Sequence, residues 1–235
     1  MISTLDVLGQ LRKTSVEVND LSDKGSPLKI DSKVVFLDEI VADNQELRTR
    51  YSLDGRVTNA ASLEVLAFEV QLDMFSDRGG GGHLNYDVDF FFKQEGIAPG
   101  SEVPVKENAT GWEIVPYHAD VSARAARAEG RVIYAEFADG STFGHSDWGS
   151  SLHAGRIGTM DRMKALVQIY EDGDSSAFSK SIRGAVANQE MSEYTRQMLA
   201  DLAGILVTRG VDAVAAEIRT RLACAQRHMN AMKST

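Results

Sequence analysis

The chain contains one cysteine, no long apolar run and no surplus of basic residues. Cys224 has no second cysteine with which to form an internal disulfide, so cysteine usage leaves the redox compartment open. No stretch of about 18 apolar residues occurs, which excludes a membrane-spanning helix. The N-terminus lacks a basic start followed by an apolar stretch, so we expect no signal peptide and, by default, a cytoplasmic protein.

The basic residues are too few to balance the acidic ones, and the net charge is −9. Residues 1–154 hold 14 Lys and Arg against 25 Asp and Glu, a net −11, whereas residues 155–235 hold 11 against 9, a net +2. Phosphate backbones and anionic lipid surfaces are bound by basic patches. We therefore expect neither a nucleic-acid partner nor a membrane surface.

Familiar catalytic and phosphate-binding signatures are also missing. The segment around Ser150 does not form a G-x-S-x-G turn. The glycines at 79–82 lead into an apparent strand without the Lys-Ser/Thr pair of a phosphate loop. Asp172 opens a stretch similar to a calcium loop, but Ala177 and Arg183 replace its required glycine and glutamate.

The hydrophobic period changes near Arg156, from every second residue to every third or fourth. These periods are typical of strands and helices, respectively. Residues 66–75 and 84–93 alternate most regularly and predict an antiparallel hairpin with a connection at 77–83. Its apolar, inward-facing positions are Leu66, Phe68, Val70, Leu72, Met74, Leu84, Tyr86, Val88, Phe90 and Phe92.

A register centred on this connection sets Leu72 opposite Val88 and brings acidic side chains together on the outer face. Like charges across a strand pair destabilise it. A hard cation such as Ca²⁺ or a basic protein partner would relieve the repulsion, and solvent screening is the alternative. The acidic group comprises Glu69, Asp73, Asp87 and Asp89.

Further short strands are indicated at 33–41, 112–121 and 131–138, the last running into an Asp-Gly turn. Residues 122–129 suit either a short helix or a strand. Together these elements predict an antiparallel β-sandwich, broadly immunoglobulin-like, over residues 30–150. Residues 1–29 are interpreted as an N-terminal arm with at most a short helix.

Residues 156–232 have a helical pattern, which makes the predicted fold class α+β with segregated strands and helices. Thr159 is a candidate cap for a first helix ending before Gly173. Asp174 is a candidate cap for a second, short helix. A third helix is expected at 189–209, ended by Gly210, and a fourth follows it.

Two imidazoles and a carboxylate, His145, Asp147 and His153, lie in the glycine- and serine-rich stretch 144–155. Such a set can bind zinc or iron and support hydrolysis. Surface histidines in a loop are the alternative interpretation. Trp148, in the same stretch, could stack on a sugar or peptide, or pack in the core.

These observations favour a non-enzymatic binding or assembly module that contacts a protein partner or self-associates and needs no cofactor. The alternative is a metal-dependent hydrolytic enzyme built on His145, Asp147 and His153, with zinc as its ion. Calcium at the acidic hairpin face is a separate hypothesis. The metal content of the purified protein distinguishes these alternatives.

Overall fold

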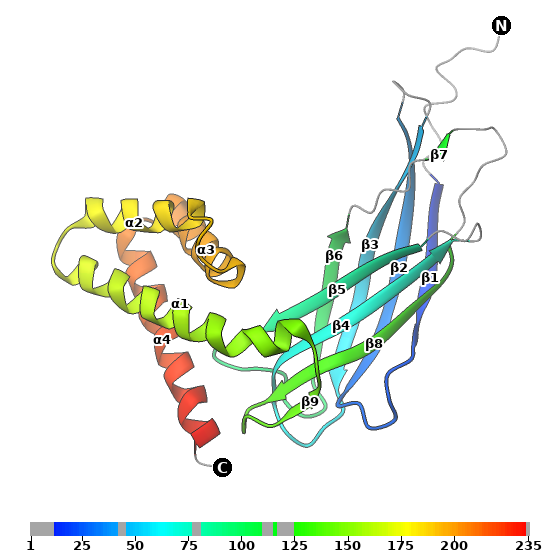
Figure 1. Cartoon of the computed structure of the whole chain (residues 1–235), viewed down its shortest axis with the longest axis horizontal. Helices are drawn as coiled ribbons and strands as arrows, with labels where there is room; N and C mark the ends of the chain where they lie inside the picture. Colours follow the sequence, from blue (N-terminus) through cyan, green and yellow to red (C-terminus); the bar gives the residue numbers. More distant parts are fainter. Residues whose placement is uncertain (1–11, 42–45, 77–80, 110–114, 117–124, 234–235) are drawn as a thin grey trace, which may run out of the picture.

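The computed structural model describes residues 12–41, 46–76, 81–109, 115–116 and 125–233, which form nine strands followed by four helices (Figure 1). The strands are β1 (Arg12–Asp20), β2 (Leu28–Val41), β3 (Glu46–Asn59), β4 (Val65–Ser76), β5 (Gly81–Asp89), β6 (Glu102–Ala109), β7 (Val115–Pro116), β8 (Ala125–Phe137) and β9 (Thr142–Gly144). The helices are α1 (Asp147–Glu171), α2 (Ser175–Ala187), α3 (Glu193–Arg209) and α4 (Val211–Lys233). This order confirms the segregated α+β class.

The strands pair into one mixed sheet in the order β5-β4-β8-β1-β2-β3-β6, with β7 beside β3 and β9 beside β8. Only β1 and β8 run parallel, through residues 18–20 and 128–130. The sheet curves into a half-barrel, so that β4, β5 and β8 cross the direction of β2, β3 and β6 in Figure 1. The predicted immunoglobulin-like sandwich is not confirmed, because the pairing is continuous from β5 to β6.

Three segments were interpreted differently from the sequence, were left open between helix and strand, or are described only in part. Part of the expected N-terminal arm is β1, which lies inside the sheet between β8 and β2. The ambiguous stretch 122–129 belongs to β8 from Ala125 onward. Of the strand expected at 112–121, only β7 is among the described residues, and Trp112 lies outside them.

The predicted hairpin is confirmed as the antiparallel pair β4 and β5, but its register is shifted by four residues. Leu72 lies opposite Leu84 instead of Val88. The difference arises because Gly81 and Gly82 belong to β5, where Gly81 pairs with Phe75, whereas the sequence assigned them to the connection. An even shift leaves each side chain on its predicted face. Glycines 79 and 80 lie outside the described residues.

The concave face of the sheet holds the first hydrophobic core. Residues from both ends of the strand order meet there, which explains why the curved sheet encloses a core without a second sheet. Complete burial of each large apolar side chain contributes about 1.5–3 kcal/mol. The members include Leu28, Val34, Leu53, Val57, Phe68, Leu72, Ile97, Val105 and Val132.

Helix α1 begins well before the predicted cap at Thr159. The side chain of Ser146 caps it by accepting a hydrogen bond from the N–H of Gly149 at 2.9 Å. Thr159 is instead buried in mid-helix, where its hydroxyl shares a 2.9 Å hydrogen bond with that of Thr195 in α3. The stretch interpreted as a loop is therefore the first two turns of a helix.

The end of α1, the start of α2 and the end of α3 agree with the sequence. Gly173 follows α1 with a φ of 81°, a conformation that favours glycine, and Gly210 ends α3 with a φ of 84°. Asp174 caps α2 by accepting a hydrogen bond from the N–H of Ala177 at 2.7 Å. Helix α3 begins after the cap Ser192, a few residues later than expected.

Sheet and helices share two contact regions. Phe91 and Phe92, directly after β5, are buried in the second hydrophobic core, which otherwise consists of residues from the four helices. Leu152 of α1 packs on the outer face of the sheet against Ala67 and Tyr134. The end of β5 is thus enclosed by the helical region, and the N-terminal half of α1 covers part of the convex side of the sheet.

Candidate functional site

The acidic residues singled out on the hairpin lie on one face, but they have different surroundings. Asp73 lies opposite His83, and its Oδ1 is 2.9 Å from the histidine Nδ1. This hydrogen bond holds the pKa of Asp73 below its ordinary value. Asp73 is therefore already paired with His83, and its register partner on β8 is Glu129.

Glu69 and Asp87 lie directly opposite each other across β4 and β5. Glu69 is only 3% exposed; its Oε1 accepts a hydrogen bond from the amide of Asn85 at 2.9 Å, whereas Oε2 has no hydrogen-bond partner among the described residues. Burial raises the pKa of Asp87, and the nearby charges of Glu69, Glu193 and Asp89 raise it further. Both groups would be stabilised by a donor or a cation.

Asp89, at the end of β5, is bound by a buried arginine. Arg156 of α1 is 3% exposed and donates to both carboxylate oxygens of Asp89, at 3.0 and 2.8 Å. Its third nitrogen donates to Glu136 of β8 at 2.6 Å. The guanidinium also lies over the Phe91 ring, 4.4 Å from its centroid. Arg156 therefore joins α1, β8 and the end of β5.

Two tyrosine hydroxyls complete this cluster. Tyr134 donates to Glu136 at 3.2 Å, and Tyr194 of α3 donates to Asp89. Burial raises the pKa of each tyrosine, and the neighbouring carboxylate raises it further. Both hydroxyls stay protonated at neutral pH and act as hydrogen-bond donors. The carboxylates of Asp89 and Glu136 are thus occupied by partners within the protein.

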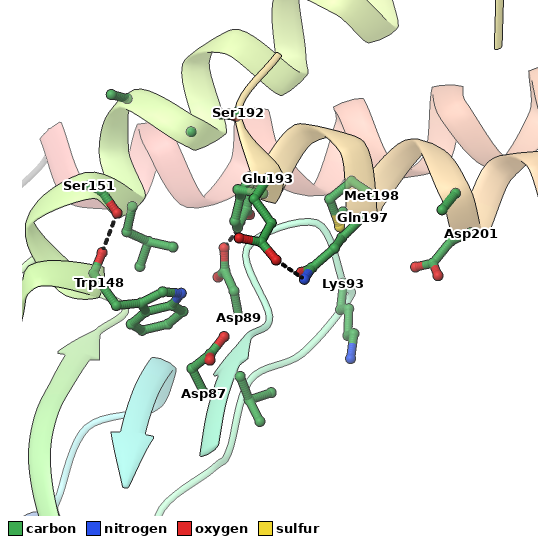
Figure 2. A pocket seen from close by; sticks show the side chains of 16 residues that line it. Asp87, Asp89, Lys93, Trp148, Ser151, Ser192, Glu193, Gln197, Met198 and Asp201 are labelled. Atoms are coloured by element: carbon green, nitrogen blue, oxygen red, sulfur yellow. Dashed lines mark hydrogen bonds between the residues drawn. The ribbon is translucent and has the colours of Figure 1, made fainter. Parts of the chain in front are cut away.

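Beside this cluster is a pocket of about 1010 Å³ between β5, α1 and α3 (Figure 2). In Figure 2, Trp148 and Glu193 lie on different sides of Asp87, with Gln197 and Met198 further along α3. Trp148 also packs edge-on against Tyr134, with ring centroids 6.0 Å apart. The lining residues are Asp87, Val88, Asp89, Lys93, Trp148, Ser151, Leu152, Ala154, Gly155, Ser192, Glu193, Tyr194, Gln197, Met198, Ala200 and Asp201.

The charge of this pocket is mostly negative and partly uncompensated. Among the described residues, neither Asp87 nor Glu193 forms an ion pair. Glu193 lies in the first turn of α3, where the helix dipole stabilises the ionised form. The lining ammonium of Lys93 lies 4.9 Å from the Phe90 ring centroid and points away from the carboxylates in Figure 2.

The second predicted set does not converge. His145 precedes α1, with its Nε2 3.2 Å from the Ser150 hydroxyl, while Asp147 and His153 are exposed residues of α1. Six residues separate Asp147 from His153, which places them about 120° apart around the helix. Within the described ranges, no three His, Cys, Asp or Glu side chains are grouped to hold a metal ion. Zinc at this set and calcium at the hairpin stay predictions.

No protein-family model, curated protein or solved structure matches this chain. In the described part of the chain, no helix combines the length and the apolar character needed to span a membrane.

Three important residues of the junction were not singled out from the sequence: Glu136, Arg156 and Glu193. Arg156 marked the change of period, and a charged residue on the apolar stripe of a helix is the signal that could have indicated burial. No such signal marks Glu136 or Glu193. An acidic residue at a polar position of the sequence pattern can lie either in solvent or beneath another element, and the pattern is the same in both cases.

Proposed function

We propose that this protein is a non-enzymatic binding module and that the pocket between β5, α1 and α3 binds a cationic group of its partner, an ammonium or a guanidinium. The observation that supports this most directly is the pair of carboxylates, Asp87 and Glu193, which line the pocket without an ion-pair partner among the described residues. A cation between them would offset the repulsion from Glu69, Glu193 and Asp89, which adds to the effect of burial in raising the pKa of Asp87.

The aromatic wall of the pocket favours the same ligand chemistry. A cation over the face of a tryptophan is stabilised by the ring quadrupole, by about 0.5–1 kcal/mol at exposed sites and by more when water is excluded. Trp148 lines the pocket and is only partly exposed. Carboxylates together with an aromatic surface select a cation over an anion or a neutral polar group.

The expected affinity for an isolated cationic group is modest. Partly exposed ion pairs contribute about 0.2–1 kcal/mol each, so two of them and one aromatic contact supply about 1–3 kcal/mol, which leaves a free amine with a dissociation constant of about 10 mM or weaker. Tighter binding requires further contacts from the molecule that carries the cation.

Titration with cadaverine and with arginine amide, followed by calorimetry or by tryptophan fluorescence, tests this proposal. We expect binding that weakens with added salt and falls at least three-fold in Asp87→Asn and in Glu193→Gln. Asp73→Asn is the matched control, because Asp73 lies on the same face and is paired with His83 outside the pocket. Equal binding by all four proteins, or no binding at all, would refute the proposal.

A further inference from the structure

Strand β5 forms one edge of the sheet. The residues of β5 that are not hydrogen-bonded to β4 direct their backbone groups outward. In the described part of the chain β5 pairs with β4 alone. The N–H of Phe90 donates to the carbonyl of Leu66 at 2.8 Å. In an antiparallel pair, hydrogen-bonded and non-hydrogen-bonded pairs alternate, so the even-numbered residues of β5 direct their backbone groups to β4.

The odd-numbered residues of β5 therefore direct their N–H and C=O groups to the open edge. The non-glycine residues among them are His83, Asn85, Asp87 and Asp89, and their side chains lie on the convex, acidic face. An open edge with outward backbone groups is a template for another strand. The other end of the sheet, β6, contains Pro104, which has no N–H to donate.

We propose that the cationic group belongs to an extended segment of a partner protein, with alternating basic and apolar residues, which adds to the sheet as a strand along β5. This inference rests on the proposed function, because it assigns the bound cation to the side chain opposite Asp87. Strand addition supplies the backbone hydrogen bonds that a free amine lacks.

The alternation of basic and apolar residues in the partner segment follows from the two faces of β5, one acidic and one apolar. Cross-strand neighbours share a face, with Cβ atoms about 4.5–5.5 Å apart. A residue opposite Asp87 is therefore on the pocket side, within reach of Glu193 for a lysine or arginine. The residues next to it in sequence lie on the concave side, opposite Tyr86 and Val88, which are only partly buried at the border of the first core.

A second copy of this chain, pairing through β5 itself, is disfavoured by charge. Antiparallel pairing of two β5 strands centred on Asp87 would set the Asp87 side chains of both copies opposite each other with no added cation. Like charges opposite each other destabilise strand pairs. The electrostatics of this edge thus select a basic segment over self-association.

The first test uses a seven-residue peptide of alternating lysine and valine with blocked ends, titrated into the full chain. Two further peptides are N-methylated, one at every lysine amide and the other at every valine amide. The backbone amides of a β-strand point alternately to its two neighbours, so strand addition requires one set and leaves the other in solvent. We expect one methylated peptide to lose at least ten-fold in affinity while the other binds as the parent does.

The direction of the added strand follows from which peptide fails. In antiparallel addition, the residues opposite Asn85 and Asp87 donate to β5, so the lysine amides are required. In parallel addition the donors are the flanking residues, so the valine amides are required. Equal affinity of all three peptides would overturn strand addition.

A pair of variants tests the same edge from the protein side. Asn85→Pro removes an outward N–H, whereas Asn85→Ala keeps it, and both lose the hydrogen bond to Glu69. Proline is tolerated on the open side of an edge strand. We expect the proline variant to bind the peptide at least three-fold more weakly than the alanine variant, while both bind cadaverine equally.

The outcomes separate the two proposals. Cadaverine binding without any preference among the peptides leaves the cationic pocket in place and refutes strand addition. Loss of both amine and peptide binding refutes both proposals. Should the proline variant fail to fold, the methylated peptides still decide the matter with the unchanged protein.

Discussion

Substituting Arg156 with methionine tests whether the junction between sheet and helices depends on a desolvated cation. The guanidinium forms three hydrogen bonds to Asp89 and Glu136, at 3.0, 2.8 and 2.6 Å, and lies over the Phe91 ring. Methionine retains much of the apolar volume and the contact with Phe91. The substitution therefore removes mainly the charge and its donors.

The expected loss of stability follows from the two carboxylates that the substitution leaves without a cation. Two buried carboxylates lose their cation: Glu136 keeps the Tyr134 hydroxyl as a donor, and Asp89 keeps the Tyr194 hydroxyl and the N–H of Phe91. Breaking a buried ion pair by removing one partner costs about 3–5 kcal/mol, a large part of the roughly 5–15 kcal/mol that stabilises an ordinary domain. The triple variant R156M/D89N/E136Q removes all three charges of this ion-pair cluster, so we expect it to recover most of this loss.

Urea unfolding at neutral pH, monitored by circular dichroism and tryptophan fluorescence, gives the free energies. Arg56→Met is the control, because Arg56 forms a 2.7 Å ion pair with Glu102 in which both side chains are more than half exposed. That substitution should cost less than about 1 kcal/mol. A loss for Arg156→Met no larger than that of the control, or a triple variant less stable than the single one, would refute this reasoning.

Three further substitutions have defined outcomes in the same unfolding assay. Asp87→Asn should raise stability by a few tenths to about 1 kcal/mol at neutral pH, because it removes a like charge opposite Glu69. Since the pKa of Asp87 is raised in the folded protein, the wild type should gain stability relative to this variant as the pH falls through that pKa, and the opposite slope would contradict the assignment. Gly149→Ala should lose about 1–3 kcal/mol, because its Cβ would lie 2.6 Å from ring atoms of Tyr134; an unchanged midpoint would show that the ring moves freely. Ser146→Ala should lose about 0.5–2 kcal/mol through the missing cap, and a helix content and midpoint equal to the wild type would refute the capping role.

The sequence predicted local structure best where the hydrophobic pattern agrees with the residues that mark the ends of helices and strands. The alternation in β4 and β5 identified the hairpin and its two faces, and the glycines after α1 and α3 identified the helix ends. The register was wrong because Gly81 and Gly82 have no side-chain pattern, so nothing local distinguishes strand from connection. The start of α1 was missed for a related reason, since glycines and serines obscured the stripe that begins at Leu152.

The candidate site could be predicted only in part, because its chemistry depends on which face α1 covers. Asp87 and Asp89 were identified as an anomaly of charge. The alternation of polar residues is the same for a solvated face and for one buried under a helix, so the burial of Glu69 was not visible. The contact between Asp89 and Arg156 joins residues 67 positions apart. A local sequence pattern cannot indicate such a long-range contact.

The position of β1 has a consequence for synthesis on the ribosome. Its partner on one side, β2, follows directly, but its parallel partner β8 comes much later, and the bond between the Ser22 hydroxyl and the Val132 amide spans 110 residues. At roughly 5–20 residues per second, β1 is translated about 5–20 s before β8 emerges. During that interval one edge of the nascent sheet has no partner, and an unpaired edge is prone to aggregation. The pairing of β1 with β8 thus becomes possible only late in translation, and it is a long-range contact of the kind that slows folding.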